Sequence, residues 1–200
     1  MDSATLVKQL LDDGDEVYCL TVDYGQRHRR EIGSAMELCR LWNLPHRIVD
    51  LSDVGAMLVN NSQTGNVDVP HGHYAEDTMK QTVVPNRNMI LLSVAAAWAI
   101  DLKADRVAYG AHSGDHAIYP DCRAEFVTAM QRAIKLADWH QVDLYAPFQD
   151  MHKGEIASLG HELGVPFDMT WTCYEGGEEP CGECGACQER TEAMEFAAKC

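Results

Sequence analysis

Apolar residues recur with helical spacing in some segments and as short β-rich runs in others, and the two patterns alternate along the chain. Helices are expected at residues 4–11, 28–44, 88–102, 122–138, 153–163 and 188–199. Strands are expected at residues 16–22, 46–51, 106–111 and 143–148. Strands separated by helices predict an α/β fold with an open parallel sheet and helices on both faces.

Two parts of the pattern depart from this regular alternation. Residues 52–82 are polar and rich in helix-breaking residues, which predicts a long loop with some helix, and a loop of this length is usually functional or mobile. The chain also opens directly on a helix, whereas an α/β domain normally opens on a strand that leads into that helix. We therefore expect one strand of the usual arrangement to be missing.

Length and charge narrow the class of protein. A chain of 200 residues suits one α/β domain with a sizeable core. The net charge of −15 disfavours nucleic acid and anionic membranes as partners. The longest apolar stretch, residues 89–100, is too short to span a bilayer, and Met1 is not followed by a secretory signal pattern. These features predict a cytoplasmic protein.

Four cysteines near the C-terminus, Cys173, Cys181, Cys184 and Cys187, have the spacing C-x7-C-x2-C-x2-C. Closely spaced cysteines on glycine-rich turns are typical of zinc sites, and four thiolates leave no open position, so the spacing favours one structural Zn²⁺. Disulfides and free thiols are the alternatives, although disulfides are disfavoured without a secretory signal. We expect a zinc-binding segment at residues 169–200, after an α/β domain at residues 1–168.

Polar side chains follow the predicted strands, where parallel sheets bind ligands. Arg87 and Lys153 have the chemistry to hold phosphates. Asp121 is either a helix cap or a carboxylate that faces an amine of a ligand. Cys122 has no obvious histidine partner, so we do not expect a nucleophile there. The basic residues 27–30 form either a solvated first helical turn or a binding site for phosphate or carboxylate.

Four motifs in this order resemble the 7-cyano-7-deazaguanine synthase (preQ0 synthase) family of queuosine biosynthesis, and the resemblance spans essentially the whole chain. They are Val22-Asp23-Tyr24-Gly25-Gln26-Arg27-His28, Pro85-Asn86-Arg87-Asn88, Tyr119-Pro120-Asp121-Cys122-Arg123, and Thr170-Trp171-Thr172-Cys173-Tyr174 with the three later cysteines. The resemblance implies a PP-loop ATP pyrophosphatase with an adenine nucleotide α-hydrolase-like sheet.

The same resemblance implies an activity and its partners. Such a ligase converts 7-carboxy-7-deazaguanine, ammonia and ATP into the nitrile through adenylate and amide intermediates, releasing AMP and pyrophosphate or ADP and phosphate. It also implies a homodimer, Mg²⁺ with the ATP, and one structural Zn²⁺ per subunit.

The resemblance also implies roles for particular residues. Arg87, Lys153 and Asp121 would be catalytic. The residues that would bind nucleotide, Mg²⁺ or the deazaguanine ring are Asp2, Ser3, Asp23, Gln26 and Gly110.

The phosphate loop departs from the family pattern. The family motif is Ser-Gly-Gly-x-Asp-Ser, whereas this chain begins Met1-Asp2-Ser3, with Met1 at the variable position. We interpret Met1 as an internal methionine of that loop, a hypothesis that in-frame Ser-Gly-Gly codons immediately upstream would support. A true truncation is the rival interpretation.

Two alternative functions remain open at this point. A tRNA-thiolating PP-loop enzyme would need a reactive cysteine or an iron–sulfur site and a basic surface, which the net charge disfavours. An inactive, zinc-stapled module would account for the incomplete phosphate loop.

Overall fold

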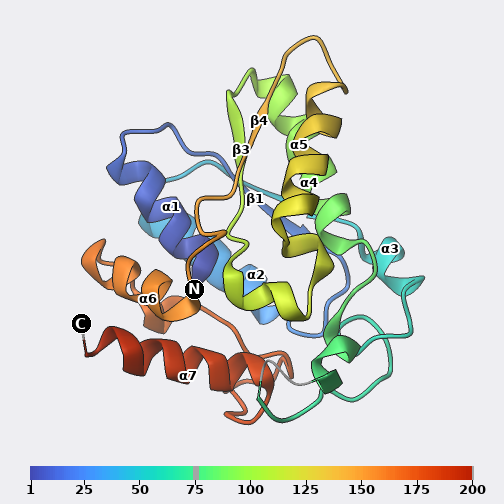
Figure 1. The fold of residues 1–200 in the computed structure, drawn as a ribbon, viewed down its shortest axis with the longest axis vertical. Coiled ribbons are helices and arrows are strands. Elements are labelled where there is room, and N and C mark those ends of the chain that lie inside the picture. Colours follow the sequence, from blue (N-terminus) through green and yellow to red (C-terminus); the bar gives the residue numbers. More distant parts are fainter. Residues whose placement is uncertain (74–76, 200) are drawn as a thin grey trace. The chain divides into compact units, whose positions relative to one another are not determined.

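The computed structural model describes residues 1–73 and 77–199. The chain divides into two compact units, which are described separately (Figure 1). Unit 1 comprises Met1–Val84 together with Lys153–Cys200, and unit 2 comprises Pro85–His152.

Unit 1 is built on two parallel strands, β1 (Cys19–Asp23) and β2 (His46–Asp50), paired from Cys19–His46 to Asp23–Asp50. The helix α2 (Arg30–Leu41) connects them, as a parallel pair requires. The other helical segments of the unit are α1 (Asp2–Asp12), α3 (Ser52–Ala56), η1 (Asp77–Thr82), α6 (Lys153–Glu162), η4 (Phe167–Met169) and α7 (Gly185–Ala197).

The core of unit 1 joins the two ends of the sequence. Met1, which precedes α1, and Ala4 of α1 pack with Leu38 of α2, Ala157 of α6 and Ala193 of α7. The helices α6 and α7 lie side by side in Figure 1. The predicted boundary after residue 168 therefore lies within a shared core, and an independent segment at residues 169–200 stays a prediction.

The helix α6 ends as its sequence predicts. Gly164 adopts a left-handed φ of +68°, and the N–H of Val165 donates to the carbonyl of Gly160 at 2.8 Å. This geometry satisfies carbonyls that the last helical turn leaves free. Close packing also requires Gly160 itself, because a Cβ there would overlap the Phe167 ring and the Thr5 hydroxyl.

The described part of residues 52–82 is a long loop with two short helical segments, α3 and η1, as predicted. Asn61, Ser62 and Gln63 are at most 2% exposed. The Asn61 side-chain oxygen accepts the N–H groups of Gln63 and Thr64, at 2.9 and 3.0 Å, and its amide donates to the Leu58 carbonyl at 2.7 Å. The segment is therefore held by local side-chain bonds to the backbone. Residues 74–76 of this segment lie outside the described residues.

Unit 2 has a second parallel pair, β3 (Arg106–Ala108) with β4 (Asp143–Tyr145). Its helical segments are α4 (Arg87–Leu102), η2 (Ser113–Ala117), η3 (Pro120–Cys122) and α5 (Ala124–Lys135). Leu92, Ala96 and Ala99 of α4 pack with Val107 of β3 and Val142 in one core.

The predicted helices and strands are present in the predicted order, and the strands run parallel. Four details needed correction. The strands are shorter than expected, and they pair two by two within each unit. The helix predicted from residue 122 begins at Ala124, because Pro120–Cys122 forms a separate 3-10 turn. The last helix begins at Gly185, directly after Cys184. Among the described residues, no helix has the length and apolar character needed to cross a membrane.

Candidate functional site

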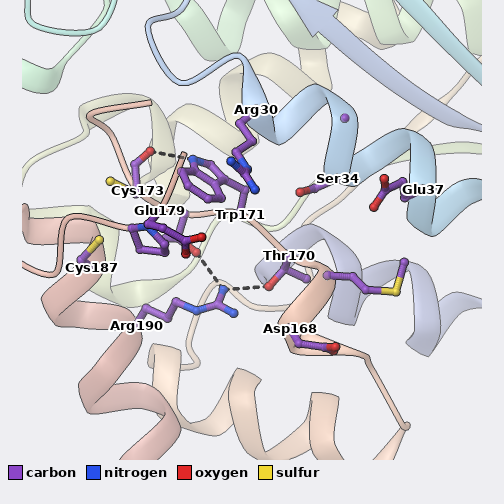
Figure 2. Close-up of a pocket in the computed structure, with 14 residues that line it drawn as sticks. Arg30, Ser34, Glu37, Asp168, Thr170, Trp171, Cys173, Glu179, Cys187 and Arg190 are labelled. Carbon is purple, nitrogen blue, oxygen red and sulfur yellow. Dashed lines mark hydrogen bonds between the residues drawn. The ribbon is translucent and has the colours of Figure 1, made fainter. Parts of the chain in front are cut away.

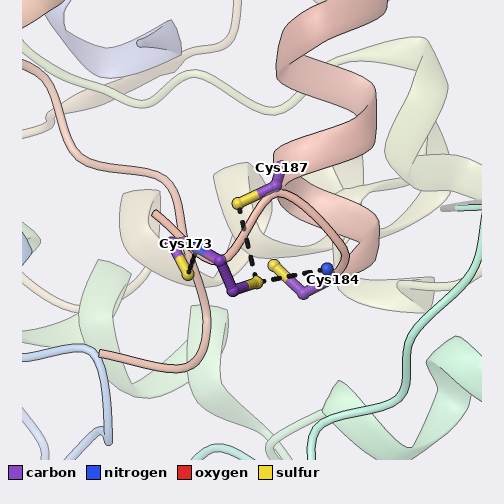
Figure 3. A group of neighbouring side chains, drawn as sticks. Cys173, Cys184 and Cys187 are labelled. Atoms are coloured by element: carbon purple, nitrogen blue, oxygen red, sulfur yellow. Dashed lines mark hydrogen bonds between the residues drawn. The ribbon is translucent and has the colours of Figure 1, made fainter. Parts of the chain in front are cut away.

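The side chains of Cys173, Cys181, Cys184 and Cys187 converge in unit 1, with all four sulfur atoms within 4.8 Å of one another (Figure 3). Cys184 precedes the first residue of α7 and Cys187 lies in its first turn. Gly182, at φ +76°, reverses the chain between Cys181 and Cys184. Four thiolates tetrahedrally disposed around one ion with bonds of about 2.3 Å would lie about 3.8 Å apart, so the cluster could hold a single metal ion.

Backbone N–H groups also point at these sulfur atoms. Cys181 N–H donates to the Cys173 sulfur at 3.4 Å, and Cys184 N–H donates to the Cys181 sulfur at 3.3 Å. Burial raises the pKa of Cys184 to about 11 and also raises that of Cys187. At Cys181 burial acts in the same upward direction, but N–H donors from Cys184 and Glu183 outweigh it and lower the pKa. A bound dication would compensate the thiolates that burial disfavours.

Residues 173–187, which carry the four cysteines and are called the metal loop below, contact two segments of unit 1 that are distant in sequence. His71 forms an antiparallel backbone bridge with Cys184, and Val69 packs against the cysteines. The 26–28 turn meets the same loop, where the rings of His28 and Tyr174 pack at a tilt of 51° with their centroids 5.4 Å apart. Gly176, at φ +70°, lies so close to the Arg27 carbonyl that a Cβ there would overlap it.

A second polar cluster lies at the beginning of α1. The Lys153 ammonium, 10% exposed, contacts Glu189 at 2.7 Å and Asp2 at 3.3 Å. Ser3 lies in the same first helical turn and is exposed. The structure therefore brings together Asp2, Ser3 and Lys153, three of the residues expected to handle ATP. Glu189 was missed by sequence reasoning, because nothing in its local pattern indicates a partner on another helix.

Asp23 and Gln26 are held by their own turn at the end of β1. Asp23 pairs with Arg29 and accepts the N–H of Gly25 at 3.1 Å. Gln26 is 1% exposed; its oxygen accepts the Tyr24 N–H at 2.9 Å and its amide donates to Glu31 at 2.8 Å. These contacts shape the turn, and a role in binding nucleotide stays a prediction for both residues.

The predicted residues of unit 2 gather beside the start of α4. Asp121 accepts the backbone N–H of Asn88 at 3.1 Å, so it caps α4. Its predicted role as the cap of the helix that follows it was wrong. Arg87 lies over the Tyr119 ring at 5.8 Å, and Gly110 follows β3. Burial, then the charges of Asp115 and Asp121, raise the pKa of Cys122, which opposes its use as a nucleophile.

The expected ATP-site residues thus divide between the units. Asp2, Ser3, Asp23, Gln26 and Lys153 belong to unit 1, whereas Arg87, Gly110 and Asp121 belong to unit 2. Their assembly into one site stays a prediction.

A cavity of about 400 Å³ lies beside the metal loop in unit 1 (Figure 2). Residues of α2, of the segment from η4 to the first cysteine, and of α7 line it. Arg190 donates to the hydroxyls of Thr170 and Thr172 at 2.7 and 2.9 Å, and to the Phe167 carbonyl. The Arg30 guanidinium lies 4.7 Å from the centre of the Trp171 ring. Sequence reasoning missed Arg190, although its position one helical turn after Cys187 was a usable signal.

The parallel strand pairs, the helices that connect them and the four-cysteine cluster define an α/β protein with a candidate metal site. The chain resembles the solved structure of the U34-tRNA thiolase NcsA from Methanococcus maripaludis with its [4Fe-4S] cluster. The TM-score is 0.51 at 14% identity, over 99% of this chain and 61% of that one. At this identity the likeness shows the fold alone.

The sequence comparisons are more specific. The family model described as "Queuosine biosynthesis protein QueC" matches residues 1–198. A 7-cyano-7-deazaguanine synthase from Pseudoalteromonas translucida is 51% identical over 195 residues, covering 98% of this chain and 89% of that protein. The protein of the same name from Methanoregula boonei is 50% identical over 197 residues, covering 98% and 91%. The chain belongs to the QueC family, and the resemblance inferred from the four motifs is confirmed.

Proposed function

We propose that this chain is an ATP-dependent ligase that converts 7-carboxy-7-deazaguanine and ammonia into 7-cyano-7-deazaguanine. The observation that carries the proposal is the whole-chain family match, with relatives of that name about half identical over nearly their full length. The same match supports a role in queuosine biosynthesis.

The chemistry demands activation at two steps. A carboxylate is a poor electrophile, so its oxygen first attacks the α-phosphate of ATP and pyrophosphate leaves. Ammonia then displaces AMP to give the amide. The amide oxygen is activated by a second ATP and departs with AMP as the C≡N bond forms. The protein's main tasks are to position these groups and neutralise phosphate charge.

The Lys153 cluster supports this proposal in unit 1. Lys153 is held at the N-terminal end of α1, where exposed N–H groups and the helix dipole favour anions. Arg87 and Asp121, in unit 2, are the other residues that we propose to be catalytic, and Mg²⁺ would accompany the ATP.

We also propose that the cysteine cluster binds Zn²⁺ as a structural ion. The donors are four thiolates with no open position, which suits zinc. A four-iron cluster separates its thiolates across the corners of a cube, and sulfur atoms within 4.8 Å of one another favour a single ion instead. A homodimer, the use of free ammonia and a cytoplasmic location belong to the same proposal.

The test is direct. The purified, metal-loaded chain is incubated with 7-carboxy-7-deazaguanine, ammonium and Mg-ATP, and products are followed by mass spectrometry. Formation of the nitrile with AMP or ADP supports the proposal. Turnover of ATP only on addition of tRNA would support the thiolating alternative, and a folded chain that forms neither product would contradict the proposal.

A further inference from the structure

The side chains that line the cavity beside the metal loop differ in charge and in exposure to solvent. Its floor includes Arg190, Trp171 and the Thr172 hydroxyl, whereas the carboxylates of Glu37, Asp168 and Glu179 are exposed at its edge. The volume of about 400 Å³ is that of a small-molecule site. A flat aromatic wall, a half-buried cationic donor and exposed acceptors are therefore combined in one hollow of unit 1.

Arg190 carries a charge that its own contacts do not neutralise. Its three hydrogen-bond partners are two hydroxyls and a carbonyl, all neutral. Among the described residues, no carboxylate lies within ion-pair distance of its guanidinium. The group is half-buried, and burial lowers its pKa, with Asp2 and Cys187 acting in the opposite direction. A guanidinium has five N–H donors, so donors remain for an additional oxygen.

Thr172 adds a second donor at the same place. Its hydroxyl oxygen accepts from Arg190 at 2.9 Å, and no acceptor within the described residues receives its proton. A guanidinium and a hydroxyl on one cavity wall match the two oxygens of a carboxylate.

Trp171 gives the cavity its shape. Its indole N–H is fixed by the Cys173 carbonyl at 2.9 Å, which sets the orientation of the ring. Arg30 extends this wall as a planar cation (Figure 2). Flat aromatic and guanidinium surfaces suit a planar heterocycle, and the carboxylates at the rim can accept ring N–H groups.

The floor also lies near the expected site of phosphate chemistry. Arg190 is within electrostatic range of Asp2, and its neighbour Glu189 contacts Lys153 at 2.7 Å. An acid bound by Arg190 would therefore lie beside the start of α1, where the nucleotide phosphates are expected.

We infer that this cavity binds a planar heterocyclic carboxylic acid, with Arg190 and Thr172 as donors to its carboxylate and Trp171 as its flat wall. The inference rests on the proposed function, since the acid is then 7-carboxy-7-deazaguanine. It assigns the acid-recognition site to the cavity next to the cysteine cluster, and gives α7 a direct part in binding substrate.

Isothermal titration calorimetry without ATP tests this site. Two ligands are compared, 7-carboxy-7-deazaguanine and 7-deazaguanine, which lacks the carboxylate. The native chain is expected to prefer the acid by about 10- to 100-fold, the value of one to two charge-assisted hydrogen bonds. Arg190→Lys and Thr172→Val are expected to reduce this preference about tenfold while leaving 7-deazaguanine binding unchanged. Ser34→Ala, on the same cavity, is the matched control and should keep the preference.

The outcomes separate a binding role from a structural one. Equal weakening of both ligands would mean that Arg190 and Thr172 only support the fold, and would overturn the inference. Displacement of the acid by pyrophosphate in an Arg190-dependent way would assign the donors to a phosphate and would also overturn it. If the chain forms the nitrile but neither substitution changes its preference for the acid, the inferred binding site is wrong and the proposed function stands. An Arg190-dependent preference without nitrile formation would support the site and count against the function.

Discussion

The ammonium of Lys153 lies 2.7 Å from a carboxylate oxygen of Glu189, although 36 residues separate them in sequence. Their side chains are only 10% and 12% exposed. Lys153→Met removes the cation beside a nearly buried carboxylate and is expected to destabilise the fold by about 3 kcal/mol. Urea unfolding followed by circular dichroism measures this change.

The double variant Lys153→Met/Glu189→Gln is the control for that substitution. It removes both charges and is expected to recover most of the lost stability. Nitrile formation should stay absent in both variants if Lys153 contacts ATP phosphates. Full activity in the double variant would exclude Lys153 from catalysis.

Two helical glycines should respond to alanine with opposite signs. At Gly160, a Cβ would overlap Phe167 and Thr5, so Gly160→Ala is expected to cost about 1–3 kcal/mol. At Gly33, a Cβ meets nothing within 4 Å, so Gly33→Ala is expected to stabilise α2 by about 0.5–1 kcal/mol. Thermal unfolding of both variants gives the comparison. Stabilisation by Gly160→Ala would show that the packing around Phe167 is looser than described.

Removal of one cysteine tests the metal site. Cys184→Ser is expected to weaken zinc binding by more than about 100-fold, since loss of a partner to a ligand alone costs about 10- to 100-fold. Cys39→Ser is the matched control, because Cys39 is a buried thiol of α2 outside the cluster. Metal content after dialysis, measured by mass spectrometry, should fall only in the first variant. Equal metal content in both would contradict the assigned ligands.

Two substitutions at Asp121 distinguish a helix-capping role from a catalytic role. Asp121→Ala removes the acceptor for the Asn88 N–H and is expected to destabilise unit 2 by about 1 kcal/mol. Asp121→Asn keeps an acceptor but not the charge, so most of the stability should remain. Loss of nitrile formation in the asparagine variant at native-like stability would support the catalytic role, and full activity would limit Asp121 to capping.

His46 should make stability depend on pH. Burial lowers its pKa from the ordinary value of 6.5, and Thr21 lies 2.9 Å from its Nε2. The unfolded chain then binds the proton more readily, so stability should fall as pH falls below about 6.5. His46→Gln should reduce this loss when unfolding is compared at pH 5 and pH 8. An unchanged difference between the two pH values would assign the dependence to other groups.

Much of the fold followed from local patterns. The apolar spacing that ends before Gly164 predicted the end of α6, whereas the last helix begins at Gly185, three residues before its predicted start. The parallel direction of the strands was also predictable, because helices between short apolar runs require parallel neighbours, but their pairing two by two was not.

Long-range contacts were not predictable from those patterns. Nothing around Asp121 indicates that it caps a helix that begins 34 residues earlier, and nothing around Glu189 indicates Lys153. Such contacts depend on tertiary packing, which local spacing does not encode. The burial of Asn61 was not predictable for a related reason, since buried polar residues that bond to their own backbone have the same composition as a solvated loop.

The backbone bridge between His71 and Cys184 restrains the chain around His71. Gly72 N–H also donates to the Glu183 carbonyl at 3.3 Å, so this strand-like contact fastens the chain after Val69 to the cysteine turn. Such contacts reduce the conformational entropy of the chain segments that they hold. If the cysteine cluster holds an ion, withdrawal of that ion would loosen the contacts at His71 and Gly72, more than 100 residues away in sequence, and proteases should cut there first.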